Sequence, residues 1–161
     1  MSQIVIAPAT VLSLFPLHRL FAEAVVTHFS YFPAEVQKRV IKDHSVYKLM
    51  LATVDQHRVI LVARKRGKII GYAIGAAPRT GPAQLFWLYV DPDFRGANTG
   101  LSLLSRMLRH LQAMGARVVS IATHDHRLYY ERQGFKHVKK TIVNGVKMDI
   151  LNFRLSQAVP V

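Results

Sequence analysis

The stretch Val-Asp-Pro-Asp-Phe-Arg-Gly-Ala-Asn-Thr-Gly-Leu, residues 90–101, joins two segments with different hydrophobic periods. The apolar run at residues 84–91 is typical of a buried strand, and from Leu101 onward apolar residues recur at helical spacing. The pattern predicts a strand, a turn of small residues and a long amphipathic helix. The first turn of a helix carries N–H groups without partners and partial positive charge, and small residues let a phosphate approach them. The junction is therefore a candidate cradle for a diphosphate.

Downstream of this junction, the helix is predicted to continue to Met114, with Gly115 just beyond its end. The chain then alternates between β-rich and helical segments, and Asn144-Gly145 is a typical two-residue hairpin turn between the last two strands. The predicted elements are a strand at residues 117–123, a short helix at residues 125–133 that ends at Gly134, and strands at residues 135–143 and 146–155.

Upstream of the junction, two prolines mark helix starts. Pro16 suits the first turn of a helix that ends near His28, and Pro33 opens a second helix in the same way. A further short helical piece is expected at residues 45–53. Strands are predicted at Ser2–Ile6 and at residues 58–64 and 68–76, the last two forming a hairpin around residues 65–67. Because no repeat or linker divides the chain, we expect one domain over residues 1–161.

The composition is that of a globular protein with an unusual charge. Among 161 residues, 22 Lys and Arg against 9 Asp and Glu give a formal net charge of +13, and almost all of this excess lies in residues 57–161. That part of the chain should attract anionic ligands, nucleic acid included, unless the charge only keeps the surface soluble. Cysteine is absent, and we find no signal peptide and no run of about 20 apolar residues. These features predict a cytoplasmic protein without a membrane partner.

A second motif, Tyr-Glu-Arg-Gln-Gly-Phe at residues 130–135, closes the short helix. Together the two motifs resemble those of the GNAT acetyltransferase superfamily, whose first motif is matched by Arg95, Gly96 and Gly100. The resemblance covers roughly residues 57–155. It implies an α/β fold with a mixed central sheet of about seven strands flanked by about four helices. It also implies an N-acetyltransferase that uses acetyl-CoA as co-substrate and holds no metal.

The resemblance also implies roles for single residues. Where the strand before the turn separates from its neighbour, backbone groups would contact the pantetheine arm, and an N–H near Tyr89 would polarise the thioester carbonyl. Tyr130 takes the position of the general acid that protonates the departing thiolate, unless it is a core tyrosine that anchors its helix. Tyr129 is expected to serve packing. The implied cofactor-binding residues are Leu88, Tyr89, Val90, Arg95, Gly96, Ala97, Asn98, Thr99 and Gly100.

Two positions depart from the family pattern. Asn98 replaces a glycine; asparagine tolerates a left-handed backbone, but its side chain could also cap the helix and occupy the N–H groups that a phosphate needs. Gln84 stands where some family members carry a glutamate base, and a neutral amide cannot accept the proton of an ammonium group. His124 and His126 are the histidines available near the expected site, and His124 is the candidate proton relay. The run at residues 124–126 is interpreted as a surface loop in which Asp125 caps the next helix, rather than as a metal site.

Three classes of function agree with these features. The first is an N-acetyltransferase whose acceptor amine belongs to a small molecule or a protein. The second is the same reaction on an amine attached to RNA, such as aminoacyl-tRNA, which the positive charge favours. The third is a binding module that has lost catalysis, suggested by Asn98 and Gln84. Acceptor choice is expected to depend on residues 29–32 and 139–147, and the resemblance implies that a homodimer through the late strands is an option.

Overall fold

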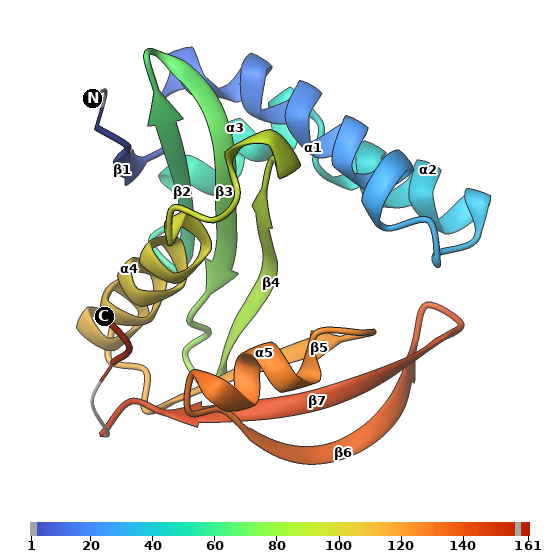
Figure 1. Cartoon of the computed structure of the whole chain (residues 1–161), viewed down its shortest axis with the longest axis vertical. Helices are drawn as coiled ribbons and strands as arrows, with labels where there is room; N and C mark the ends of the chain where they lie inside the picture. Colours follow the sequence, from blue (N-terminus) through green and yellow to red (C-terminus); the bar gives the residue numbers. More distant parts are fainter. Residues whose placement is uncertain (1–2, 157–158) are drawn as a thin grey trace.

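The computed structural model describes residues 3–156 and 159–161, so Ser2, which we expected to begin the first strand, lies outside the described residues. Seven strands form one sheet, and five α-helices and two 3₁₀ turns connect them (Figure 1). The strands are β1 (Val5–Pro8), β2 (Arg58–Lys65), β3 (Lys68–Ala76), β4 (Ala83–Val90), β5 (Val118–Thr123), β6 (Lys136–Val143) and β7 (Val146–Arg154). The helices are α1 (Leu14–His28), α2 (Ala34–Asp43), α3 (Val46–Val54), α4 (Thr99–Ala113) and α5 (Arg127–Arg132), and the 3₁₀ turns are η1 (Val11–Ser13) and η2 (Pro92–Phe94).

The sheet has the order β1-β2-β3-β4-β5-β7-β6, and every neighbouring pair is antiparallel except β4 with β5. The parallel pair arises because the long α4 carries the chain from the end of β4 back to the start of β5, whereas the antiparallel pairs need only short turns. The Asn144-Gly145 turn joins β6 to β7 as predicted, with φ angles of 51° and 79°. The predicted α/β fold with a mixed sheet of about seven strands is confirmed.

Apolar layers hold helices on both faces of the sheet. On one face, α4 contributes a stripe of side chains that are 0 % exposed, namely Leu103, Leu104, Met107, Leu108 and Leu111. On the other face, Leu17 and Phe21 of α1 and Leu49 of α3 pack with Ile60 and Tyr72 of the sheet. The spacing of three and four residues in these stripes is the reason that each helix buries one side.

The helical piece expected at residues 45–53 is confirmed as α3, whose first turn is capped by the Ser45 hydroxyl, which brings the α-helices among the described residues to five. The prediction that Asp125 caps α5 is wrong, because His126 takes the N-cap position and makes no side-chain cap bond. The loop is held instead by the Thr123 hydroxyl, which accepts from the His126 N–H at 3.1 Å, and by Asp125, whose Oδ1 lies 3.3 Å from His126 Nε2.

Strands β4 and β5 pair only over a short stretch. The pairs run from Ala83 with Val119 to Leu85 with Ile121, and beyond them the two strands separate. The register between β3 and β4 shifts at the same place, which leaves Phe86 as an extra residue on β4. Such a bulge bends a strand away from its ladder. The C-terminal half of β4 therefore has backbone groups on its β5 side without a strand partner.

Candidate active site

A cavity of about 430 Å³ opens where β4 leaves β5. Its walls come from the end of β4, the turn that follows, the first residues of α4, helix α5 and the end of α1. All the cofactor-binding residues implied by the resemblance line this cavity except Ala97. Tyr130 lines it as well, whereas Gln84 and His124 do not.

The turn before α4 is shaped by two left-handed residues, Gly96 with φ of 88° and Asn98 with φ of 56°. The side chain of Asn98 makes no cap bond, so the first N–H groups of α4 are not occupied by it. Of our two interpretations of Asn98, the structure favours tolerance of the left-handed backbone and contradicts the capping side chain. Arg95 fixes the turn from one end, since its Nε donates to the Val90 carbonyl at 3.0 Å.

Thr99 supplies a second sign of a binding site. Its side chain is only 3 % exposed, and its hydroxyl is buried without a hydrogen-bond partner among the described residues. A buried polar group normally has a partner, and Thr99 sits at the first helical position of α4 in the cavity wall. An anionic oxygen held by the N–H groups at this helix start would accept a hydrogen bond from the Thr99 hydroxyl. The residues present therefore fit a diphosphate at this place.

Along the part of β4 that no longer pairs with β5, only every second backbone N–H group points away from β3 and toward the cavity. Asp91 N–H donates to the Ile70 carbonyl on β3 at 2.8 Å. Because the direction of backbone groups alternates along a strand, the Tyr89 N–H points at β3 as well, and those of Leu88 and Val90 point at the open edge. The N–H that faces the cavity therefore belongs to Leu88 or Val90, one residue away from the position first inferred near Tyr89.

Two tyrosines of α5 face the cavity. Tyr130 is half-buried, with its ring against Phe135 at a centroid distance of 5.4 Å, so it anchors α5 and lines the cavity at once. Burial, reinforced by Tyr129 and Tyr31, raises the pKa of Tyr130 well above that of a free phenol. Tyr129 does more than pack: its hydroxyl lies 3.7 Å from the point that a Cβ would take at Gly100, beside the start of α4. Burial raises the pKa of Tyr129 too.

The end of α1 adds two residues to the cavity wall: His28, which the sequence analysis did not assign to the site, and Phe29, which it placed only in the segment expected to govern acceptor choice. The His28 ring lies 5.6 Å from the Tyr89 ring between centroids. The signal that could have found them is the dense run His-Phe-Ser-Tyr-Phe at residues 28–32, where aromatic side chains continue past the end of the helix. His126 and Gln133 of the α5 region also line the cavity.

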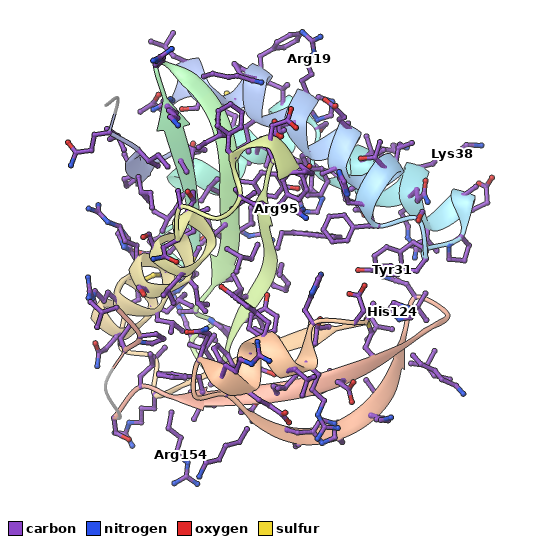
Figure 2. The ribbon with its side chains drawn as sticks, in the orientation of Figure 1. Arg19, Tyr31, Lys38, Arg95, His124 and Arg154 are labelled. Carbon is purple, nitrogen blue, oxygen red and sulfur yellow. The ribbon has the colours of Figure 1, made fainter. Side chains whose placement is uncertain are left out.

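His124 lies at the neighbouring edge of the site. Its ring stacks on Tyr31 with 4.4 Å between centroids, and its Nδ1 is 3.1 Å from the Lys147 carbonyl (Figure 2). Burial and the nearby Asp125 raise the pKa of Tyr31 to about 12. This stack links the α1–α2 loop to the end of β5. Trp87 serves the core, because its ring packs edge-on against Phe21 at 5.2 Å.

The family follows from sequence and fold together. The sequence model of the acetyltransferase (GNAT) domain matches residues 56–137, half of the chain, and contains both the turn before α4 and the whole of α5. The chain therefore belongs to the GNAT acetyltransferase family. No curated protein sequence matches it.

Solved structures share the whole fold at low identity. The PaiA N-acetyltransferase of Thermoplasma acidophilum, in complex with coenzyme A, has a TM-score of 0.79 and 20 % identity over 94 % of this chain and 99 % of that one. YncA of Salmonella typhimurium, with its cofactor acetyl-CoA, has a TM-score of 0.71 and 16 % identity over 99 % and 98 % of the two chains. An acetyltransferase of Thermus thermophilus has a TM-score of 0.68 and 23 % identity over 96 % and 99 %.

Proposed function

We propose that this protein transfers the acetyl group of acetyl-CoA directly to the nitrogen of an amine. The observation that carries the proposal is the meeting, in one cavity, of the open β4 edge, the helix start with its orphaned Thr99 hydroxyl, and Tyr130. The solved relatives that contain coenzyme A or acetyl-CoA support the same ligand here. The chain offers no cysteine that could carry the acetyl group, which favours direct attack over a covalent enzyme intermediate.

Each part of the cavity has a separate task. The N–H groups at the start of α4 and the Thr99 hydroxyl bind the diphosphate of the cofactor, with the helix dipole adding attraction. The N–H of Leu88 or Val90 donates to the thioester oxygen as negative charge develops there. The Tyr130 hydroxyl gives its proton to the departing thiolate. A phenol is protonated at neutral pH, as this task requires, and burial raises the pKa of Tyr130 further.

Removal of the amine proton falls to a histidine. His28 lines the cavity and is exposed, so it can pass the proton to solvent, whereas neither His124 nor the Tyr31 ring on which it stacks lines the cavity. We expect His28→Gln to lower kcat/KM about tenfold, since water replaces the imidazole only in part. His124→Gln is the matched control, and steady-state kinetics of both variants are the measurement. A larger loss of kcat/KM in His124→Gln than in His28→Gln would show that His124, and not His28, relays the amine proton.

Asn98 should be a mild obstacle to the cofactor. Asn98→Gly removes a side chain that lines the cavity and makes no cap bond, and glycine adopts φ of 56° without strain, so acetyl-CoA should bind a few-fold more tightly. Asn98→Val should bind it more weakly, because a β-branched residue resists the left-handed backbone. Calorimetric titration of the three proteins with acetyl-CoA tests this. Weaker binding by the glycine variant would show that the amide side chain itself contacts the ligand.

The proposed reaction is tested by titrating the protein with acetyl-CoA and then screening amines for release of free coenzyme A thiol. Binding together with turnover on at least one amine class supports the proposal. Binding without turnover on small amines, peptides and aminoacyl-tRNA would indicate a module that keeps the ligand and has lost the reaction. Absence of binding would contradict the cofactor assignment.

A further inference from the structure

Away from the active site, the start of α1 exposes apolar side chains that its amphipathic pattern does not require. Val11, Leu12 and Phe15 are 72, 89 and 72 % exposed, while Leu14 and Leu17 of the same segment are buried. Val5 on the adjoining strand β1 is 57 % exposed. A helix of this kind normally turns polar residues to solvent on its outer side. Several large apolar side chains exposed together mark a contact surface.

The exposed side chains of Val11, Leu12 and Phe15, here called the apolar tip, are held rigidly. The Ser13 hydroxyl accepts from the Thr10 N–H at 2.8 Å and from Arg64 Nη2 at 2.6 Å, which ties η1 to strand β2. Ser13 is 1 % exposed. Because the turn is fixed on its inner side, the outer side chains of Leu12 and Phe15 project in a defined direction instead of folding back onto the protein.

Positive charge surrounds the apolar tip. The β2–β3 hairpin turn lies beside the first turns of α1 at one end of the molecule (Figure 1). A cavity of about 530 Å³ between them has walls that are both apolar and cationic, including Leu12, Phe15, Ile69, Arg19, Arg64 and Lys68. The hairpin turn adds Lys65 and Arg66. Nearby carboxylates are fewer: Glu23 lines the same cavity, and Asp91 lies 3.9 Å from Lys68 Nζ.

We propose that this end of the molecule, the apolar tip of Val11, Leu12 and Phe15 with its cationic border, binds the surface of an anionic phospholipid bilayer. Projecting apolar side chains enter the boundary between headgroups and acyl chains, and the surrounding cations contact lipid phosphates. The mixed walls of the cavity suit an amphiphile, which carries an anionic group next to an apolar one. A second copy of the chain is a poor occupant, because it would bring two sets of like charges together.

The proposal does not conflict with the helices seen in the fold. Among the described residues, none of the helices combines the length and apolar character that crossing a bilayer requires. The sequence-based expectation of no membrane partner rested on features of spanning or exported proteins, and a peripheral contact needs no spanning segment.

The test is sedimentation of the purified protein with vesicles of phosphatidylcholine alone and of phosphatidylcholine mixed with phosphatidylglycerol. We expect binding to the anionic vesicles only, lost at 1 M salt, where the Debye length is about 3 Å. Leu12→Ser/Phe15→Ser and Arg19→Glu/Lys65→Glu should each weaken binding about tenfold or more. The matched controls are Val54→Ser, an exposed valine at the end of α3, and Lys139→Glu/Lys140→Glu on the edge strand β6, and both should bind like the wild type.

Three outcomes would overturn the proposal. One is no binding of the wild type to anionic vesicles. Another is equal weakening by the β6 charge variant, which would indicate attraction by net charge without a defined surface. The last is a wild-type dimer that Leu12→Ser/Phe15→Ser converts to a monomer, which would make the apolar tip a self-interface. Thermal unfolding and acetyl-CoA titration of every variant show that the fold and the active site are intact.

Discussion

Replacing Tyr130 with phenylalanine is expected to lower kcat about 100-fold or more while leaving acetyl-CoA affinity and thermal stability near those of the wild type. The ring keeps its contact with Phe135, so only the hydroxyl and its proton are lost. Without that proton the thiolate must leave as an anion or wait for water. Steady-state kinetics at saturating acetyl-CoA, with calorimetric binding alongside, separate the chemical step from affinity.

The pH dependence of turnover is a second test of Tyr130 as the acid. Burial raises the pKa of Tyr130 above its ordinary value of 10.0, so the protonated form that acts as an acid persists as the pH rises. Wild-type turnover should therefore not decline below pH 10 through ionisation of this group. Tyr129→Phe is the control, because its hydroxyl faces Gly100 at the helix start. If Tyr129→Phe lost more turnover than Tyr130→Phe, the two tyrosines would have to exchange roles.

A carboxylate at position 100 is expected to abolish cofactor binding without unfolding the protein. A Cβ at Gly100 would lie 3.7 Å from the Tyr129 hydroxyl and 3.8 Å from Val90, which are ordinary contacts, so a side chain fits. An aspartate in the first turn of α4 even suits the helix dipole, so stability should hold. It would place negative charge where we propose that the diphosphate binds. Gly100→Asp should weaken acetyl-CoA binding about 100-fold or more.

Gly100→Asn is the matched control for that experiment, since it has nearly the same shape and no charge. Calorimetric titration should show the asparagine variant binding at least about tenfold more tightly than the aspartate variant. The difference should shrink in high salt because the solvent screens the repulsion. Equal affinities for the two variants would mean that the diphosphate lies elsewhere and that this helix start has only a structural role.

The turn between β4 and α4 could be located from the sequence because its features are local. The end of an apolar strand, the small residues and the start of a helical period all lie within residues 90–101, and backbone rules translate them directly into exposed N–H groups. Tyr130 could be placed for a similar reason, since its motif contains Gly134, just past the end of α5. The orphaned Thr99 hydroxyl could not be foreseen, because its burial depends on the packing of α4 against the sheet.

The parts that were missed depend on tertiary contacts or on the direction of single side chains. His28 and Phe29 reach the cavity because α1 packs across the sheet face that holds Tyr89, some sixty residues later in the chain, and no local pattern encodes that meeting. His124 follows a buried Thr123 at the end of β5, and its exposed ring turns to Tyr31. The N–H that faces the cavity could be fixed only once the Asp91 bond to Ile70 set the phase of the strand.

The short ladder between β4 and β5 has a mechanical consequence. Only the pairs from Ala83–Val119 to Leu85–Ile121 join the two halves of the sheet edge to edge, so the remaining contact across this seam comes from packed side chains, such as the stack of Tyr31 on His124. A ligand bound between the separated ends of β4 and β5 would contact both halves of the sheet and hold them together. The protein would then be most rigid in the state that reacts, with acetyl-CoA bound.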